Sequence, residues 1–321
     1  MGVLLFFFKG ENKTMKRVLI ATEKPFAPSA LEQIKGVIAE AGYEIKLLEK
    51  YTSKLELLEA VKDVDAIIVR SDIVDRELLD VAKELKIVVR AGAGFDNLDL
   101  TACTEKGVVA MNTPGQNSNA VAELAIGMMV FMARSNFKGG PGSELKGKTV
   151  GVYGCGNIGR RVARIAQGFG MRVIALDPCV TKVSMDPYDV TVVQSIEELF
   201  SKSDYLSLHI PSNDKTKNSV NFDLMNKMPK GATLVNTARK EVIDEDGLKK
   251  MLEERPDFKY ISDIIPSCHE ELAAKYELRY YSTPKKQGAE TSEANVNAGV
   301  AAAEQIVAFF EKNDQTYRVN K

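Results

Sequence analysis

The chain has 321 residues, of which 43 are Lys or Arg, 44 are Asp or Glu and 45% are hydrophobic. This length is sufficient for a large core and two domains, and no run approaches the ~18 apolar residues of a membrane span. The balanced charge gives no electrostatic reason to expect nucleic acid or a membrane surface as a partner.

The chain contains four cysteines and two histidines, and their distribution argues against two classes of site. No two cysteines form a C-x-x-C pair, so we expect free thiols and a reducing, cytoplasmic location rather than a disulfide framework. Two histidines are too few for a His-rich metal centre, and no metal is expected. These residues are Cys103, Cys155, Cys179, Cys268, His209 and His269.

The chain begins with residues 1–14, which we predict to be a disordered extension because Met15 directly precedes the first strand-like run. Beyond it, apolar runs of strand length alternate with amphipathic helical patterns. Near-continuous Val and Ile strands separated by helices are typical of a parallel sheet covered on both faces. The predicted strands of this first series are residues 17–22, 44–49, 66–70, 87–91 and 108–112.

A helical pattern with few charges, residues 121–134, separates this series from a second one. After a Gly-rich connection, strands and helices alternate again, and an Ala-rich helix at 290–311 follows them. The predicted strands of the second series are residues 149–154, 172–177, 205–210, 232–237 and 260–264. The sequence therefore predicts an α/β protein with two doubly wound parallel-sheet domains.

The first strand of the second series runs into V-Y-G-C-G-N-I-G-R-R, which places G-x-G-x-x-G between a strand and a helix. In such a loop Gly154 permits the tight turn, Gly156 lets backbone approach a pyrophosphate, and Gly159 allows close helix–strand packing. Amide groups at the helix N-terminus then meet the phosphate charge. The loop residues expected to bind a dinucleotide are Gly154, Gly156, Asn157, Ile158 and Gly159.

The next strand ends at Asp177, close to the spacing of about 20 residues expected for a carboxylate that binds a ribose 2′-hydroxyl. The sequence that follows, D-P-C-V-T, brings no Arg or Lys directly after it. A 2′-phosphate would face this carboxylate without a neutralising cation. NAD is therefore expected in preference to NADP.

Several longer motifs follow one another in the order found in one enzyme family. The second half contains G-C-G-N-I-G, S-D-Y-L-S-L-H-I-P (203–211) and N-T-A-R-K-E-V-I-D-E-D-G-L (236–248). The first half contains V-R-S-D (69–72), V-R-A-G-A-G-F-D-N (89–97) and N-T-P-G-Q-N-S-N-A-V-A-E-L (112–124). From about residue 16 to the C-terminus the chain resembles the D-isomer-specific 2-hydroxyacid dehydrogenases. It is most similar to the short D-3-phosphoglycerate dehydrogenases that end without a regulatory domain.

The resemblance implies a Rossmann NAD-binding domain, residues 119–285, inserted into a flavodoxin-like substrate domain made of residues 15–118 and 286–321. It also implies an active site in the cleft between the domains and a homodimer built on the NAD-binding domain. Further cofactor contacts are expected at His209, Pro211, Thr237, Ala238 and Asp263.

Oxidation of a 2-hydroxy acid needs an anchor for the carboxylate and a base for the hydroxyl proton. Arg239 follows the fourth strand of the nucleotide-binding domain, at a carboxyl end where ligands bind, and its planar fork suits a carboxylate. It also matches the family's substrate-binding arginine. The family's base is a His two residues before a Gly, and counting back from Gly288 puts Lys286 there. Counting forward from Pro284 gives Lys285, because this loop is one residue longer.

The family pairs its His with a Glu, whereas this chain has Cys268 at that position, with Glu270 and Glu271 nearby. The change is chemically consistent with a lysine base, because a carboxylate would move a lysine pKa of ~10.4 further from neutrality. Desolvation and the positive charge of Arg239 would lower it instead. The expected catalytic residues are Arg239, Lys286 and Glu270.

Candidates for the far end of the substrate lie in the first half of the chain, at or just after predicted strand ends. A substrate that bears a phosphate favours an Arg in such a place. The candidates are Arg70, Ser71, Gly92 and Asn112, with Arg239 at the carboxylate end.

The predicted function is NAD-dependent oxidation of D-3-phosphoglycerate to 3-phosphohydroxypyruvate in serine biosynthesis. One alternative is a reductase for glyoxylate or hydroxypyruvate, or one of the D-lactate type. Another is an NAD-sensing binding protein of the same fold, which the missing His–Glu pair would allow.

Overall fold

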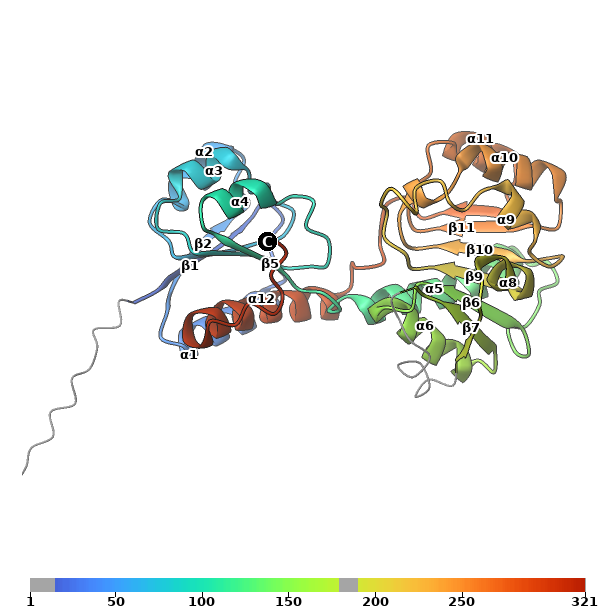
Figure 1. The fold of residues 1–321 in the computed structure, drawn as a ribbon, viewed down its shortest axis with the longest axis horizontal. Helices are drawn as coiled ribbons and strands as arrows, with labels where there is room; N and C mark the ends of the chain where they lie inside the picture. The colour runs from blue at the N-terminus through green and yellow to red at the C-terminus, as the bar shows by residue number, and fades with distance from the viewer. Residues whose placement is uncertain (1–14, 179–189, 321) are drawn as a thin grey trace, which may run out of the picture. The chain divides into compact units, whose positions relative to one another are not determined.

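The computed structural model describes residues 15–178 and 190–320 (Figure 1). The predicted extension, residues 1–14, and Cys179 lie outside the described residues. The chain divides into two compact units. Unit 1 comprises Met1–Gln116 and Asn295–Lys321, and unit 2 comprises Asn117–Ala294. Unit 2 is thus inserted in the chain between the two segments of unit 1.

Unit 1 is built on a five-stranded sheet in the order β2-β1-β3-β4-β5, with every pairing parallel. This is the strand order of flavodoxin-like sheets. The strands are β1 (Arg17–Thr22), β2 (Glu44–Glu49), β3 (Ala66–Val69), β4 (Ile87–Arg90) and β5 (Val109–Asn112). The helices are α1 (Pro28–Glu40), α2 (Lys54–Ala60), α3 (Arg76–Val81), α4 (Leu100–Glu105) and α12 (Ser292–Lys312).

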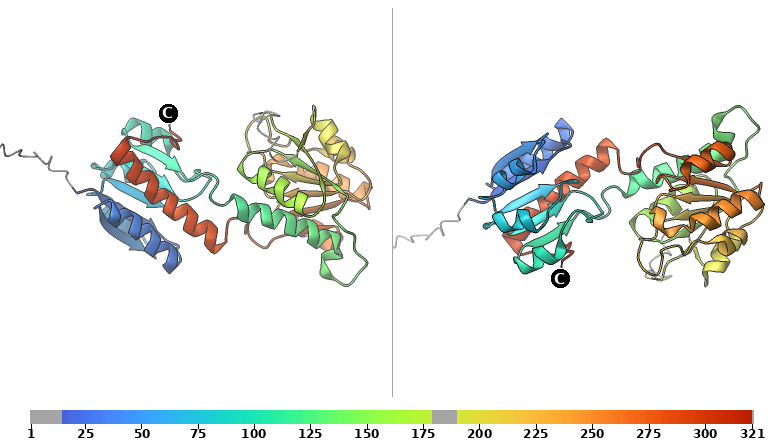
Figure 2. Two further views of the ribbon diagram at one scale, coloured as in Figure 1. Left: turned by 90° about the horizontal axis from the view of Figure 1, so that it is seen from below. Right: turned by 90° about the horizontal axis from the view of Figure 1, so that it is seen from above.

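Helices cover both faces of this sheet (Figure 1). α1 and α12 lie side by side on one face, where a Cβ on Gly299 would come within 2.4 Å of Ile34 Cδ1 (Figure 2). α2, α3 and α4 cover the other face. Because both faces are covered, β3 is buried along its whole length, as its run of Ala, Ile and Val predicts.

Unit 2 contains a seven-stranded parallel sheet in the order β12-β11-β10-β9-β6-β7-β8. The strands are β6 (Thr149–Tyr153), β7 (Arg172–Leu176), β8 (Thr191–Val192), β9 (Tyr205–Leu208), β10 (Thr233–Asn236), β11 (Lys259–Ser262) and β12 (Tyr280–Ser282). The chain proceeds in one direction across the sheet from β6 to β8 and in the other from β9 to β12. This reversal is the topological switch point of a Rossmann-type sheet, and it lies between β6 and β9.

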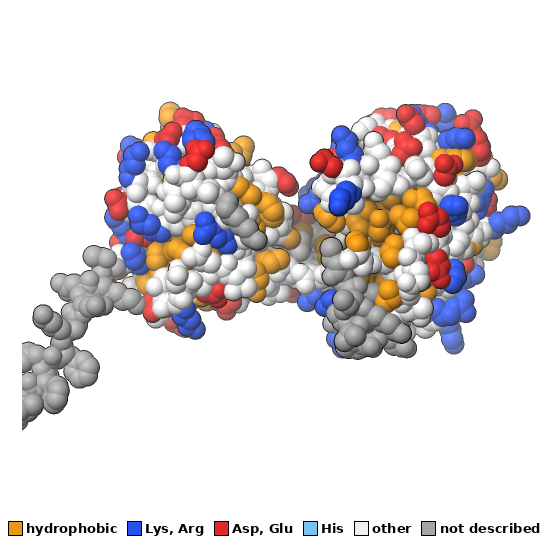
Figure 3. All heavy atoms as spheres, in the orientation of Figure 1, with side chains coloured by type: hydrophobic (Ala, Val, Ile, Leu, Met, Phe, Trp, Pro, Cys, Tyr) orange, Lys and Arg blue, Asp and Glu red, His pale blue; other side chains and the backbone are white. Residues whose placement is uncertain are grey.

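The helices of unit 2 include two long ones, α5 and α6, that pack against the core beside β6. The α-helices are α5 (Ser118–Ala133), α6 (Asn157–Gly168), α8 (Ile196–Lys202), α9 (Phe222–Asn226), α10 (Glu245–Glu254) and α11 (His269–Lys275). Short 3₁₀ turns follow at η1 (Ser135–Phe137) and η3 (Lys240–Val242). Acidic and basic side chains are interspersed on the visible face of each unit (Figure 3).

The division of the chain differs from the expected boundaries at residues 119 and 285. It falls after Gln116 and after Ala294, so the loop that contains Lys286 belongs to unit 2. The physical reason is the carboxylate of Asp263. Its Oδ1 accepts hydrogen bonds from Thr283 Oγ1 at 2.9 Å and from the amide of residue 287 at 2.8 Å, and its Oδ2 accepts one from the amide of residue 288 at 2.8 Å. These bonds tie the loop to the end of β11.

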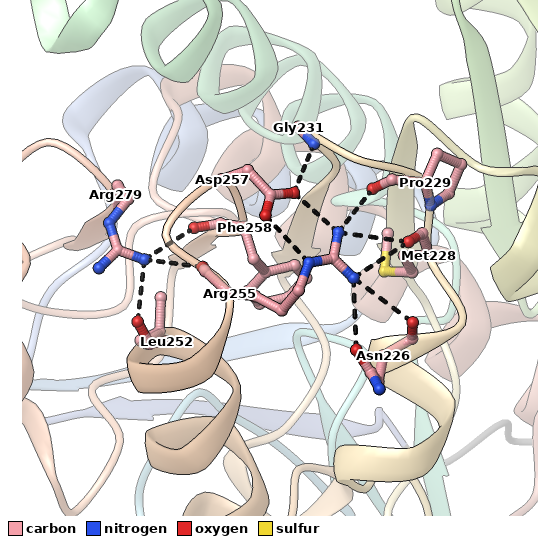
Figure 4. Close-up of polar contacts among 9 residues, drawn as sticks. All are labelled: Asn226, Met228, Pro229, Gly231, Leu252, Arg255, Asp257, Phe258 and Arg279. Atoms are coloured by element: carbon pink, nitrogen blue, oxygen red, sulfur yellow. Dashed lines mark hydrogen bonds and ion pairs between the residues drawn. The ribbon is translucent and has the colours of Figure 1, made fainter.

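Two arginines hold the loops at the amino ends of β10, β11 and β12 (Figure 4). Arg255 binds both carboxylate oxygens of Asp257, at 3.0 and 2.7 Å, and this contact holds the pKa of Asp257 well below its usual range. Arg255 also donates to the backbone carbonyls of Asn226, Met228 and Pro229. Arg279 donates to the carbonyls of Leu252 and Arg255, both at 3.0 Å. Because the strands are parallel, this cluster lies at the sheet edge opposite their carboxyl ends.

Candidate cofactor and substrate sites

The residues expected to bind the cofactor follow the carboxyl ends of neighbouring strands in unit 2. Asp177 follows β7, Gly154 follows β6, His209 follows β9 and Thr237 follows β10. These strands are adjacent in the order β10-β9-β6-β7, so the residues line one sheet edge on both sides of the switch point. Asp263 continues the row after β11. This is the edge at which open α/β sheets bind their ligands.

The glycine loop is closely packed at Gly154 and Gly159 and open at Gly156. Gly154 has a φ of +91°, and a Cβ there would lie 2.7 Å from the carbonyl oxygen of His209. A Cβ on Gly159 would lie 2.1 Å from the carbonyl oxygen of Gly154. Gly156, at the N-cap of α6, faces open space. Two glycines are thus required by packing, and the third leaves the backbone accessible to a ligand.

The start of α6 adds positive charge next to this loop. A hollow of about 510 Å³ is lined by Asn119, Asn157, Arg160, Arg161, Arg164 and Ile165. Arg160 Nε donates to the carbonyl of Cys155 at 3.0 Å, which ties the helix to the loop, and Ile158 packs against the core. Cationic side chains beside a helix N-terminus favour an anionic group such as a pyrophosphate.

Asp177 is held against the glycine loop. Its Oδ2 accepts a hydrogen bond from the amide of Cys155 at 2.6 Å, at the strand end where a ribose-binding carboxylate is expected. Cys155 itself is buried, and burial together with the charge of Asp177 raises the pKa of its thiol to about 11. A neutral, buried thiol of this kind is unreactive.

Two polar atoms at adjacent strand ends are buried without a hydrogen-bond partner in the described part of the chain, His209 Nδ1 and Thr237 Oγ1. The other ring nitrogen of His209, Nε2, lies 2.9 Å from Ser207 Oγ. Burial lowers the pKa of His209 to about 3, so the imidazole is neutral at physiological pH and is a poor proton acceptor. Buried polar atoms are normally paired, and unpaired ones call for an explanation such as a ligand. With the open face of Gly156, these atoms fit a dinucleotide along this edge.

Arg239 is the cation of the turn that follows β10. It is half-buried with an extended backbone, and its Nη1 donates to the carbonyl of the buried Ala238 at 2.9 Å. Within residues 15–178 and 190–320 the structure shows no other hydrogen bond of this guanidinium. Most of its five N–H donors are therefore available to a carboxylate. Pro211, the remaining predicted cofactor residue, is exposed two residues after His209.

The lysine loop follows β12, at the end of the same row. Lys285 and Lys286 are both exposed, and the Asp263 carboxylate, which is 1% exposed, anchors the loop that carries them. The structure thus shows Asp263 holding this loop, and its contact with the cofactor stays a prediction. The choice between the two lysines also stays a prediction.

The segment expected to supply a carboxylate partner lies at α11. Glu270 is exposed in the first turn of this helix and makes no hydrogen bond or ion pair with any other described residue. Cys268 is half-buried, and burial and the neighbouring Glu245 raise the pKa of its thiol to about 11. His269 Nδ1 lies 2.7 Å from Tyr280 Oη. The catalytic role of Glu270 is therefore still a prediction.

In unit 1 the predicted substrate residues also lie at strand ends. Arg70 and the exposed Ser71 follow β3, Gly92 follows β4, and Asn112 ends β5. Asn112 is buried, and its Nδ2 donates to the carbonyl of Ala93 at 2.6 Å, which fixes the loop after β4. The four residues therefore share one edge of this sheet.

The guanidinium of Arg70 already has several partners inside unit 1. Its Nη1 donates to the carbonyls of Lys24 and Pro25, at 3.1 and 3.2 Å, and its Nη2 donates to Asn295 Oδ1 at 2.7 Å. Its Cζ lies 5.2 Å from the ring centroid of Phe26. A substrate contact of Arg70 stays a prediction, but these bonds show that it braces the N-terminal part of α12.

Two residues at this edge were not among the sequence candidates. A Cβ on Gly92 would lie 1.5 Å from Arg90 Nη1, so the guanidinium of Arg90 lies over Gly92, and its Nε donates to the Arg70 carbonyl at 2.9 Å. Asp72 is buried and accepts hydrogen bonds from the Glu23 amide, the Arg70 amide and Tyr51 Oη. The signal for Arg90 was present in R-A-G-A-G, an arginine at a strand end before a glycine.

In the parts of the chain that the structure describes, no three His, Cys, Asp or Glu side chains gather as a metal site. Over the same residues, no helix combines the length and apolar character needed to cross a membrane. Cys103, Cys155 and Cys268 are free thiols.

Comparison with known proteins assigns the family. The sequence model described as D-isomer specific 2-hydroxyacid dehydrogenase, NAD binding domain, matches residues 121–287. The chain is 38% identical to D-3-phosphoglycerate dehydrogenase from Methanocaldococcus jannaschii over 288 residues, which is 84% of this chain and 54% of the relative. It therefore spans about half the length of that relative. It is 34% identical to hydroxypyruvate reductase from Thermotoga maritima over 280 residues, 82% of this chain and 90% of the relative.

Among solved structures, the chain is similar to NAD⁺-bound 3-phosphoglycerate dehydrogenase from Entamoeba histolytica. The TM-score is 0.84 and the identity is 45%, over 96% of this chain and 99% of that one. The similarity extends over both units, and the family model matches the part that contains the glycine loop, Asp177 and Arg239. The chain thus belongs to the D-isomer-specific 2-hydroxyacid dehydrogenases, and unit 2 is its NAD-binding domain.

Proposed function

We propose that this protein is an NAD-dependent dehydrogenase that oxidises D-3-phosphoglycerate to 3-phosphohydroxypyruvate in serine biosynthesis. The observation that carries the proposal is the row of strand ends in unit 2. The glycine loop, the Arg239 turn and the lysine loop follow β6, β10 and β12 of one sheet. The names of the relatives from M. jannaschii and E. histolytica support this choice of substrate.

The reaction removes a proton from the C2 hydroxyl and a hydride from C2, and NAD, when bound, supplies the hydride acceptor. We assign the carboxylate anchor to Arg239, because two parallel N–H groups would fix both the position and the orientation of the substrate. We assign the acid/base to Lys286, which takes the hydroxyl proton in oxidation and returns it in reduction. His209, neutral and of low pKa, is left on the cofactor side.

A lysine base makes a prediction about pH. The ordinary pKa of a lysine is ~10.4, so the rate of oxidation should continue to rise on the alkaline side of neutrality. The position that holds Glu in the family carries Cys268, whose thiol is neutral at these pH values because its pKa is raised to about 11. No negative charge at this position then stabilises the protonated form of the base.

For the phosphate end of the substrate we propose contacts from unit 1. Arg90 supplies a cation above Gly92, and Ser71 adds an exposed hydroxyl at the neighbouring strand end. Asn112 holds the loop after β4 through the Ala93 carbonyl. Arginine is well suited to this task because its fork binds phosphate through two N–H groups.

Lys285 and Lys286 provide a matched pair for the test, because they are adjacent, exposed and equally charged. Lys286→Ala should lower the rate of NADH formation from D-3-phosphoglycerate by roughly 10²–10⁴-fold, the usual contribution of a general base. Lys285→Ala should change it by less than about threefold. The measurement is the steady-state rate for both variants over a range of pH.

Two outcomes would contradict the proposal. Equal losses in the two variants, or full turnover in Lys286→Ala, would remove Lys286 from the mechanism. A wild-type protein that binds NADH but converts none of the 2-hydroxy acids would instead be an NAD-sensing binding protein.

A second candidate function is reduction of hydroxypyruvate, which the name of the relative from T. maritima favours. The phosphate group of the substrate distinguishes the two candidate functions. A phosphoglycerate dehydrogenase should prefer D-3-phosphoglycerate over D-glycerate, and Arg90→Ala should reduce that preference. A higher kcat/KM for D-glycerate in the wild type would favour the reductase.

We further propose a homodimer formed through unit 2, in the cytoplasm. On α5, Leu124, Val130 and Phe131 are apolar yet only partly buried. The Phe131 ring lies 5.3 Å from that of Phe137 and 4.8 Å from that of Tyr281, and these two side chains are 66% and 36% exposed. An exposed aromatic cluster of this kind favours a protein partner. Phe137→Asp should convert a dimer to a monomer in light scattering, and an unchanged mass would argue against this surface.

A further inference from the structure

The side chain of Asn236 closes the turn that carries Arg239. Its Oδ1 accepts a hydrogen bond from the amide of Ala238 at 3.0 Å, and its Nδ2 donates to the carbonyl of Arg239 at 3.0 Å. A weaker contact of 3.3 Å links Nδ2 to Tyr260 Oη. Asn236 is the last residue of β10 and is fully buried. One amide thus pairs with backbone groups on both sides of the peptide bond between Ala238 and Arg239.

Few side chains can make this pair of contacts. The Ala238 amide is a donor and the Arg239 carbonyl is an acceptor, so the bridging group must accept at one end and donate at the other. This requirement also assigns the two ends of the Asn236 amide. A carboxylate of the same shape only accepts, and an apolar side chain would leave the buried Ala238 amide and the partly buried Arg239 carbonyl without this partner.

The same residue connects the turn to the strand beside it. The backbone carbonyl of Asn236 accepts hydrogen bonds from the Asp263 amide at 3.0 Å and from Ser262 Oγ at 3.2 Å. Asp263 in turn holds the loop that contains Lys286. Asn236 therefore lies between the turn of the proposed carboxylate anchor and the loop of the proposed acid/base.

We propose that Asn236 is a positioning residue that sets the direction of Arg239 toward the substrate carboxylate. The inference rests on the proposed function, in which Arg239 binds that carboxylate. Without the side-chain amide of Asn236, the turn loses two hydrogen bonds, and the guanidinium of Arg239 is no longer held in one position. Substrate binding then weakens while the chemical step, which depends on the lysine loop, changes less.

Asn236→Asp tests this because protonation restores the missing donor. Below its pKa the new carboxylic acid can accept from the Ala238 amide and donate to the Arg239 carbonyl, as the native amide does. Above it, the carboxylate faces that carbonyl without a proton to share. Burial favours the protonated form, so the transition should fall within the range in which the enzyme can be assayed.

The assay is reduction of 3-phosphohydroxypyruvate by NADH, expressed at each pH as the ratio of variant to wild type. At alkaline pH the KM of Asn236→Asp should be raised roughly tenfold, with kcat reduced by less than about threefold. The ratio of kcat/KM should recover toward one as the pH falls. Asn236→Ala, which has no proton to regain, should show the same rise in KM without recovery.

Tyr260→Phe is the matched control, because it removes the hydroxyl that contacts Asn236 Nδ2 at 3.3 Å and leaves both bonds between Asn236 and the turn. Its KM should stay within about twofold of the wild type. Should Asn236→Ala fail to fold, the isosteric Asn236→Asp can be purified at low pH and titrated upward. Hydrogen exchange of the Ala238 amide then reports the loss of its hydrogen bond to residue 236 independently of activity.

The variant Arg239→Ala separates the inference from the function on which it rests. If Arg239→Ala leaves KM and kcat unchanged, the anchor itself is wrong. If Arg239→Ala abolishes turnover while Asn236→Asp keeps the wild-type KM at every pH, the positioning role is wrong. The positioning role is also wrong if Asn236→Asp loses activity without a rise in KM, or if Ala238 exchanges at the wild-type rate throughout.

Discussion

Arg70 in unit 1 and Arg239 in unit 2 occupy comparable places in two parallel sheets, yet their guanidinium groups are used differently. Each residue lies just beyond the carboxyl end of a fully buried strand. Arg70 donates to two backbone carbonyls and to Asn295, and it lies over the ring of Phe26. The guanidinium of Arg239 donates, among the described residues, to the carbonyl of the residue before it.

The two arginines differ in how many N–H donors the described structure leaves for a ligand. The partners of Arg70 come from the loop before α1 and from α12, which is 225 residues away in the sequence. They accept three hydrogen bonds from a guanidinium with five N–H donors, so Arg70 acts as a brace within unit 1. The Arg239 guanidinium makes one hydrogen bond among the described residues, and Asn236 donates to its backbone carbonyl. The availability of donors, rather than the charge, distinguishes the two roles.

The largest effect is expected for Arg239, the arginine whose N–H donors are mostly unused in the described structure. Arg239→Ala should lower kcat/KM for D-3-phosphoglycerate by about 10³-fold or more, which corresponds to about 4 kcal/mol of transition-state stabilisation. Its thermal stability should be that of the wild type, because no other described side chain depends on the guanidinium. A variant with normal turnover, measured at saturating NAD, would end the assignment of Arg239 as the anchor.

The complementary substitution, Arg70→Ala, should lower the stability of the protein more than its turnover. Removal of the guanidinium leaves the Lys24 and Pro25 carbonyls and Asn295 without this donor, and the unfolding free energy should fall by about 2–3 kcal/mol. The kcat/KM of the folded variant should fall much less than in Arg239→Ala. Urea unfolding followed by circular dichroism checks this, and unchanged stability with lost turnover would mean that Arg70 binds the substrate.

Arg255 provides a braced arginine within unit 2, at the edge opposite the proposed site. Arg255→Ala should lower the unfolding free energy by about 2 kcal/mol and leave kcat/KM unchanged.

Because Arg255 depresses the folded-state pKa of Asp257, the ion pair contributes fully above the unfolded pKa of ~3.9 and is lost as the pH falls further. The stability difference between wild type and Asp257→Asn should therefore shrink below about pH 4. If the stability difference between wild type and Asp257→Asn stayed constant to low pH, the ion pair between Arg255 and Asp257 would not be its cause.

The smallest expected effect concerns the buried His209 at the cofactor edge. Its folded pKa of about 3 lies below the ordinary value of 6.5, so only the unfolded chain takes up a proton between these values. Stability should therefore fall as the pH drops below about 6.5, by about 1 kcal/mol more in the wild type than in His209→Gln at pH 5.5. Chemical unfolding at two pH values measures this, and parallel losses in both proteins would contradict the low pKa.

Much of the fold could be predicted because its signals are local. Runs of Val and Ile predicted the strands, and the three glycines with Asp177 predicted a dinucleotide loop, because their spacing between a strand and a helix is a property of one short segment. The structure divides the chain after Ala294, whereas the expectation was a boundary after residue 285, and the bonds from Asp263 to the following loop join residues more than 20 positions apart. Asn236 was overlooked because an Asn before a turn has no distinctive sequence signal.

By itself, the sequence determined the two parallel sheets, the preference for a dinucleotide and the candidate groups for its chemistry, because periodicity, glycine spacing and residue type are properties of short segments. Only the tertiary structure decided which of these groups are free. Arg70 donates to Asn295 and to two backbone carbonyls, the Asp263 carboxylate accepts hydrogen bonds from the lysine loop, and the Arg239 guanidinium makes one hydrogen bond among the described residues. Hydrogen-bond donors and acceptors are few on each side chain, and distant parts of the chain compete for them only once it has folded.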